Sequence, residues 1–209
     1  MSTMQRVGIV DYGMGNLVSV AGAVEYLGYE AVVSHDPRAL AETDRLILPG
    51  VGAFPDAMRN LHARGLVDAL GDLVRRRGTP LLGICLGAQL LARESEEFGR
   101  HAGLGWLDAT VSRLRPNDPA LRVPHVGWNG IRKIRDGVLL KGVPDDALFY
   151  YVHSYCIGDA PAGNVLCECD YGARFAAVLE SGRVFATQFH PEKSQQHGLT
   201  MLRNFLSVH

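Results

Sequence analysis

Leu81-Leu82-Gly83-Ile84-Cys85-Leu86-Gly87-Ala88-Gln89 is the stretch that decides the fold. It begins as an apolar strand and continues as a helix, with a cysteine where the chain changes direction. A sharp strand-to-helix turn crowds the positions two before and two after its central residue, so both must be small, and here both are glycine. We therefore predict a nucleophile elbow, in which Cys85 is lifted out of the sheet edge and its thiolate is favoured by the N-terminus of the helix.

The segments before this turn alternate between strand-like and helix-like patterns. Apolar runs typical of buried strands lie at residues 7–10, 31–33, 46–48 and 81–84. Apolar residues at helical spacing lie between them, as over residues 17–27 and 66–74. This alternation predicts an α/β fold of the flavodoxin-like kind, with a mostly parallel central sheet flanked by helices.

The second half of the chain is richer in strands and predicts an antiparallel extension of the sheet. Strand-like runs lie at residues 107–114, 123–134, 148–152, 165–169, 175–179 and 184–188, and a closing helix is expected at 197–206. No linker or internal repeat divides the chain of 209 residues, so we expect residues 1–209 to form a single domain.

Composition excludes several classes of protein. Lys and Arg number 21 against 22 for Asp and Glu, so there is no excess positive charge for a nucleic-acid partner. Four cysteines are too few for a disulfide framework, and the longest apolar run, residues 78–92, is too short for a membrane span of roughly 20 residues. The N-terminus has no signal-peptide pattern. We therefore expect a cytoplasmic protein with reduced thiols and no membrane partner.

A cysteine nucleophile requires a base, and one of the eight histidines is well placed to act as one. His190 follows the strand-like run 184–189 and precedes Pro191 and Glu192. Because proline fixes the backbone between the imidazole and the carboxylate, Glu192 can hold one ring nitrogen while the other faces the thiol. We predict that Cys85, His190 and Glu192 form a catalytic triad.

These two motifs, in this order, resemble those of the class I glutamine amidotransferases. Other segments resemble the glutaminase subunits of imidazole glycerol phosphate synthases: Asp11-Tyr12-Gly13-Met14-Gly15-Asn16-Leu17, Pro49-Gly50-Val51-Gly52-Ala53-Phe54, Pro124-His125-Val126-Gly127-Trp128-Asn129, Val152-His153-Ser154-Tyr155 and Thr187-Gln188-Phe189-His190-Pro191-Glu192-Lys193-Ser194. The resemblance covers nearly the whole chain. The sequence departs from the family at Ala88, where methionine is usual, and we expect altered packing there with unchanged chemistry.

The resemblance implies an activity and a partner. Glutamine would be hydrolysed to glutamate and ammonia, without a cofactor or a metal. The ammonia would pass to a cyclase subunit in a heterodimer, which forms imidazole glycerol phosphate and aminoimidazole carboxamide ribotide in histidine biosynthesis. The resemblance also implies substrate contacts from Gly52, Gln89, Ser154 and Tyr155, and a partner-facing side that includes Asn16, His125, Trp128 and His153.

Two backbone N–H groups are expected to hold the oxyanion of the reaction. The first belongs to Leu86, because this group is free in the first turn of the helix. The second is expected from residues 49–52, where two glycines allow a peptide plane to turn over. We hypothesise that the Gly50–Val51 peptide turns when the loaded partner binds and so recruits the Val51 N–H. An ordinary tight turn fits the same residues equally well.

Several alternatives remain open on the sequence. In its catalytic residues, the chain also resembles amidotransferases that deliver ammonia to other acceptors. Only the identity of the partner distinguishes these proteins. An elbow-cysteine peptidase or stress protein typically lacks the His-Pro-Glu unit. A zinc or redox module could use Cys156, Cys167 and Cys169, although none of them forms a Cys-x-x-Cys pair. By pattern alone, Trp128 fits an interface anchor or a core residue, and Gln89 fits a helix residue near solvent.

Overall fold

The central feature of the computed structural model, which describes residues 4–208, is an eight-stranded sheet of order β2-β1-β3-β4-β14-β13-β12-β9. Its strands are β1 (Arg6–Val10), β2 (Glu30–Ser34), β3 (Arg45–Gly50), β4 (Leu81–Cys85), β9 (Arg132–Lys133), β12 (Val165–Asp170), β13 (Arg174–Ser181) and β14 (Val184–Thr187). Strands β2, β1, β3, β4 and β14 pair in parallel, and β13, β12 and β9 continue the sheet in antiparallel fashion. The predicted mostly parallel sheet with an antiparallel extension is confirmed.

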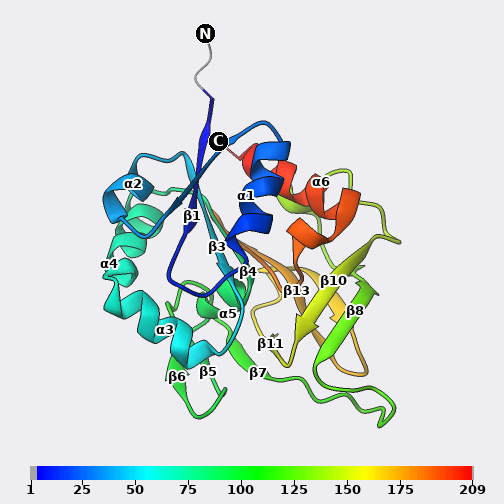
Figure 1. Ribbon diagram of the computed structural model, residues 1–209. Coiled ribbons are helices and arrows are strands. Elements are labelled where there is room, and N and C mark those ends of the chain that lie inside the picture. Colours follow the sequence, from blue (N-terminus) through cyan, green and yellow to red (C-terminus); the bar gives the residue numbers. More distant parts are fainter. Residues whose placement is uncertain (1–3, 209) are drawn as a thin grey trace.

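Helices cover both faces of this sheet (Figure 1). They are α1 (Leu17–Tyr26), α2 (Pro37–Ala41), α3 (Phe54–Ala63), α4 (Leu66–Gly71), α5 (Leu86–Leu90) and α6 (Gln195–Leu206), with short turns η1 (Asp72–Arg76), η2 (Val138–Leu140) and η3 (Pro191–Lys193). One buried apolar cluster joins α1 and α6 to the sheet, and a second joins α3 and α4 to its other face. None of the helices within residues 4–208 is long and apolar enough to span a membrane.

Two smaller sheets account for the remaining strands. Strands β8 (His125–Gly130) and β10 (Leu148–His153) form an antiparallel ribbon, and a four-stranded sheet has the order β11-β7-β5-β6. Its members are β11 (Tyr155–Asp159), β7 (Thr110–Arg113), β5 (Glu94–Ser95) and β6 (His101–Ala102). The predicted strand at 107–114 is therefore shorter than expected, and the run at 123–134 divides into β8 and β9. The sequence patterns predict neither α3 nor the strands β5, β6 and β11.

The parallel strands end together at one edge of the main sheet. Gly50 at the end of β3 pairs with Cys85 at the end of β4, and Thr187 at the end of β14 pairs with Ile84. Residues that follow these three strands therefore emerge side by side. This edge is where α/β sheets of this kind bind their ligands.

Candidate active site

Cys85 is held in a strained conformation between β4 and α5. Its φ of 54° and ψ of −111° are unusual for a residue with a side chain. The two flanking glycines make the turn possible: a Cβ on Gly87 would lie 1.8 Å from the Leu48 carbonyl oxygen, and one on Gly83 would lie 2.8 Å from the Ala88 Cα. The turn therefore has the geometry of the predicted nucleophile elbow.

His190 and Glu192 form a buried pair beside this turn. His190 Nδ1 lies 2.8 Å from Glu192 Oε1, and the two side chains are 2% and 1% exposed. The other ring nitrogen, Nε2, has no fixed partner among the described residues. Burial alone lowers the pKa of His190, but its interactions with the neighbouring Cys85 and with Glu192 outweigh burial and raise this pKa to about 10. The structure thus brings the three predicted triad residues together.

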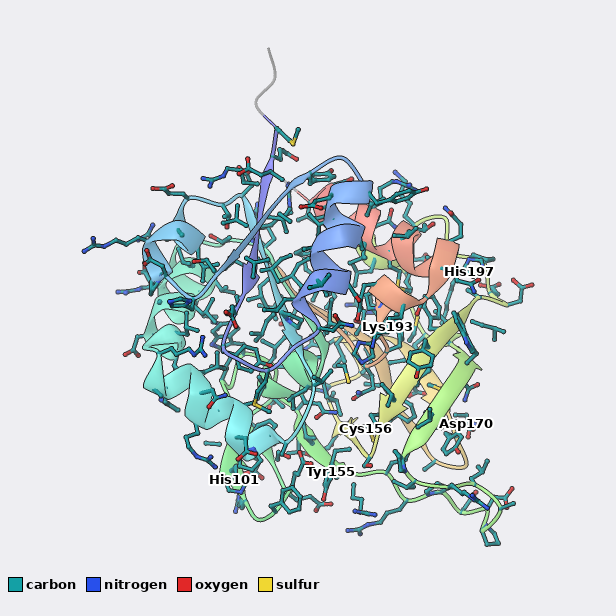
Figure 2. All side chains as sticks on the ribbon, viewed as in Figure 1. His101, Tyr155, Cys156, Asp170, Lys193 and His197 are labelled. Carbon is teal, nitrogen blue, oxygen red and sulfur yellow. The ribbon has the colours of Figure 1, made fainter. Side chains whose placement is uncertain are left out.

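The backbone of His190 is fixed by the neighbouring ribbon, which sequence reasoning did not predict. Its N–H donates to the Tyr150 carbonyl at 3.0 Å, and its carbonyl accepts from the Ser194 hydroxyl at 2.6 Å. That hydroxyl in turn accepts from the Tyr150 N–H at 3.0 Å. Lys193, labelled near the start of α6 in Figure 2, lies over the Tyr150 ring. The imidazole is therefore held through η3 by strand β10.

A cavity of about 300 Å³ adjoins Cys85. It is lined by Val51, Gly52, Cys85, Leu86, Gln89, Glu97, Pro124, Val152, His153, Ser154 and Tyr155. All six residues predicted for the oxyanion and substrate sites are in this set. One of these lining residues, Tyr155 at the start of β11, is labelled in Figure 2. Segments from four distant parts of the chain thus meet around the sulfur.

Gln89 is buried, not near solvent as its helical position alone had indicated. Only 4% of it is exposed. Its Nε2 donates to the Tyr155 carbonyl at 2.7 Å and to Gln188 Oε1 at 3.1 Å, and Gln188 Nε2 lies 3.8 Å from the Cys85 sulfur. Helix α5 is buried because β3, α3 and β14 pack against it, and these long-range contacts cannot be seen in the local pattern.

Glu97 is a pocket residue that sequence reasoning missed. Its Oε2 accepts a hydrogen bond of 2.8 Å from the Phe54 N–H at the start of α3. The neighbouring Glu96 instead accepts from the Arg113 N–H and lies outside the cavity. Both belong to a short acidic run that is typical of a solvated loop. Nothing in the spacing separates them, so only the path of the loop identifies Glu97.

The ribbon of β8 and β10 has one exposed apolar face, which we call the ribbon face. It consists of Val126, Trp128, Leu148 and Val152, which are 56%, 46%, 49% and 36% exposed. Trp128 is therefore a surface residue and not a core residue. His125 and His153 point to the opposite side and are 2% and 6% exposed, so they cannot be part of an exposed partner-facing surface. Asn16 caps α1, with its side chain accepting from the Ser19 N–H.

The other three cysteines lie in the interior. Burial raises the pKa of Cys156, Cys167 and Cys169 to about 12 each, so these thiols are neutral. Within residues 4–208, no group of three or more His, Cys, Asp or Glu side chains is arranged to hold a metal ion. The structure gives no support to the alternative of a zinc or redox module.

A strained cysteine at a strand-to-helix turn, facing a buried histidine–glutamate pair, defines the class of triad-type cysteine hydrolases. Comparison with known proteins narrows this class. Residues 8–208 match the family described as glutamine amidotransferase class-I. Solved structures with the same fold include a glutamine amidotransferase (TM-score 0.75, 24% identity, 96% of each chain covered) and PurLQS from Thermotoga maritima (TM-score 0.73, 18% identity, 98% of each chain covered).

Relatives of higher identity cover almost the whole chain. The imidazole glycerol phosphate synthase subunit HisH of Moorella thermoacetica is 49% identical over 97% of this chain and 94% of its own length. The subunit HisH 2 of Nitrobacter winogradskyi is 46% identical over 97% of this chain and 98% of its own length. The chain belongs to the class-I glutamine amidotransferase family and, within it, to the HisH subunits of imidazole glycerol phosphate synthase.

Proposed function

We propose that this chain hydrolyses glutamine at Cys85 and delivers the ammonia to a cyclase subunit of imidazole glycerol phosphate synthase, in cytoplasmic histidine biosynthesis. The observation that carries the proposal is the placement of Cys85, which lines a cavity of about 300 Å³, beside the buried His190–Glu192 pair. The family match over residues 8–208 supports a single domain for this task. Neither a cofactor nor a metal is needed for the chemistry below.

The reaction has two halves. In the first, the Cys85 thiolate attacks the side-chain amide carbon of glutamine, and protonated His190 donates its proton to the departing ammonia, which leaves a thioester. In the second, neutral His190 takes a proton from water, the hydroxide attacks the thioester, and the thiolate and glutamate are released. Glu192 accepts from Nδ1 throughout, which fixes the tautomer and stabilises the imidazolium.

Two backbone N–H groups would hold the oxyanion. Leu86 supplies one from the first turn of α5. Val51 would supply the other after the Gly50–Val51 peptide turns. The preceding peptide is anchored, because the Tyr12 hydroxyl donates to the Pro49 carbonyl at 2.8 Å. Because the Pro49 carbonyl is held, a rotation is confined to the Gly50–Val51 peptide that follows.

Substrate recognition divides between main-chain and side-chain groups. Gly52, Ser154 and Tyr155 offer backbone groups at the cavity wall, and Gln89 closes the side next to the sulfur. Glu97 is the acidic group in this wall, and its carboxylate suits the α-ammonium of an amino-acid substrate. A cavity of about 300 Å³ is of the size that holds a small molecule.

The ribbon face is the surface on which we propose that the partner binds. Four exposed apolar side chains on one side of a two-stranded ribbon are typical of a protein interface, and Trp128 is the type of residue that anchors one. Val152 belongs to this face and also lines the cavity. Ammonia released at Cys85 would therefore leave beside a surface that the partner covers. Asn16, at the start of α1, is proposed to belong to the same interface.

The partner can be tested by mixing this chain with the cyclase subunit and its ribonucleotide ligand. We expect glutamate release to rise strongly over that of the isolated chain, because the second oxyanion donor is recruited on binding. Full activity of the isolated chain would contradict the hypothesis that the Gly50–Val51 peptide turns only when the partner binds. Equal activation by the partner of a different amidotransferase would instead favour another ammonia acceptor.

The pH dependence of the reaction should reflect the raised pKa of His190. A histidine with a pKa of about 10 stays protonated through neutral pH and loses its proton only as the pH rises toward that value. Because the ammonia must be protonated as it leaves, kcat/KM should fall on the alkaline side, well above the ordinary histidine range. Glu192→Gln keeps an oxygen acceptor but removes the charge, so the alkaline limb should move to lower pH. An alkaline limb at unchanged pH in this variant would contradict the assignment of Glu192 as the carboxylate that helps to raise the pKa of His190.

A further inference from the structure

Two buried histidines, of which His153 lines the cavity, have no part in the mechanism described so far. His125 lies on β8 and His153 ends β10, and the two face each other across the ribbon in register. His125 Nδ1 lies 3.1 Å from His153 Nε2, and His153 Nδ1 lies 2.9 Å from the Tyr155 carbonyl oxygen. The two rings thus form a chain that ends on the backbone of the cavity wall.

The hydrogen-bonding partners fix the protons on both rings. A carbonyl oxygen can only accept, so His153 Nδ1 must carry a hydrogen. In a neutral imidazole the other nitrogen is then an acceptor, and His125 Nδ1 must donate to it. Burial lowers the pKa of His125 to about 4 and of His153 to about 3, which keeps both rings neutral at neutral pH. A proton added to His153 Nε2 would point its N–H at the N–H of His125 Nδ1, and the hydrogen bond between the rings would be lost.

The packing holds His125 in place for this role. Its ring lies between two tyrosine rings, 3.9 Å from that of Tyr171 and 4.8 Å from that of Tyr151, with interplanar angles of 20° and 19°. The Tyr171 hydroxyl is itself fixed, because it donates to the Arg122 carbonyl at 3.0 Å. Stacking on both faces leaves the imidazole little freedom to turn its Nδ1 away from His153.

The Tyr155 carbonyl joins this chain to the other side of the cavity. It accepts a second hydrogen bond, of 2.7 Å, from Gln89 on α5, the helix that begins at the nucleophile turn. The wall formed by Ser154 and Tyr155 is therefore tied both to its own ribbon, through His153, and to the elbow helix, through Gln89. Loss of either bond would leave the wall free to move relative to Cys85.

We propose that His153 is a positioning residue that holds the Ser154–Tyr155 wall at the distance from Cys85 that glutamine binding requires, and that His125 holds His153 in the Nδ1–H form. This inference rests on the proposed function, because it assigns the wall to glutamine. Its effect falls on the affinity for glutamine, since the wall contacts the substrate and the triad stays in place. The expected signature is a raised KM with kcat much less affected.

Matched variants of His153 test this in the complex with the cyclase subunit and its ligand. His153→Asn places an amide nitrogen at the position of Nδ1 and retains the bond to Tyr155, whereas His153→Gln places it at the position of Nε2 and loses that bond. We expect KM for glutamine to rise about tenfold in His153→Gln, because the Tyr155 carbonyl then keeps only its hydrogen bond to Gln89 and the wall loses its bond to the ribbon, and to rise clearly less in His153→Asn. Equal KM values in the two folded variants would overturn the proposal.

A second measurement needs no variant. In the ¹⁵N NMR spectrum of the wild-type complex, we expect the ring nitrogens of His153 and His125 to show the Nδ1–H tautomer in each. An Nε2–H form at His153 would overturn the proposal even if the variants fail to fold. Absence of glutamate release from the wild-type complex would instead contradict the proposed function, and the two failures are thereby distinguished.

Discussion

Replacing Cys85 by alanine is expected to reduce kcat for glutamate release by about 10⁴-fold or more in the partner complex. Loss of the nucleophile from the triad of a serine hydrolase costs about 10⁶-fold in kcat, because the remaining groups have no covalent step to assist. Glutamine should still bind, since the cavity wall keeps its other residues. The measurement is steady-state glutamate release with saturating glutamine, together with glutamine binding to the variant by calorimetry.

The matched control is Cys167→Ala. Cys167 is also fully buried, but it lies on β12 and does not line the cavity. This variant should retain most of the activity. Comparable losses in the two variants would mean that the Cys85 effect is one of stability and not of chemistry.

Replacing Gly87 by alanine should cost about 10²-fold or more in kcat/KM, although it adds one methyl group. That methyl would lie 1.8 Å from the Leu48 carbonyl oxygen, which is backbone and cannot rotate away. Strand β3 and helix α5 must therefore separate. The separation displaces both the Leu86 N–H and the Pro49–Gly52 segment from the positions where they would meet the oxyanion, and a shift of about 1 Å can cost this much.

Gly71→Ala provides the same chemical change at a harmless site. Gly71 is helical at the end of α4, and a Cβ there would have no neighbour within 4 Å. The control should keep its activity and gain slightly in stability, since alanine favours a helix. Circular dichroism should show whether the Gly87 variant is folded, and an active, folded Gly87 variant would contradict the tight elbow.

The catalytic centre could be read from the sequence because its signals are local. Two glycines flank Cys85 at fixed spacing, and a single proline separates His190 from Glu192, so neighbouring residues alone define both geometries. Helix α3 also carries a local signal, since Phe54, Ala57, Met58 and Leu61 are buried at helical spacing. It was missed, although Pro55 stands in its first turn, where proline is tolerated.

What the sequence did not reveal depends on contacts between distant segments. Gln89 lies among segments that are distant in sequence, and its side chain donates to the Tyr155 carbonyl of β11, 66 positions away. Glu97 reaches the cavity because its loop returns to the start of α3. The pairing of His125 with His153 depends on the register of the ribbon, which no single-strand pattern determines.

The central claim, a covalent reaction at Cys85, is tested most directly by trapping the intermediate. The complex is allowed to turn over glutamine, quenched in acid and digested, and the cysteine-containing peptides are weighed by mass spectrometry. We predict a γ-glutamyl thioester on the peptide that carries Cys85 and none on those carrying Cys156, Cys167 or Cys169. Steady glutamate release would contradict the account if the adduct lay on one of those other cysteines. It would also contradict the account if no adduct formed on Cys85 even when hydrolysis of the thioester is slowed.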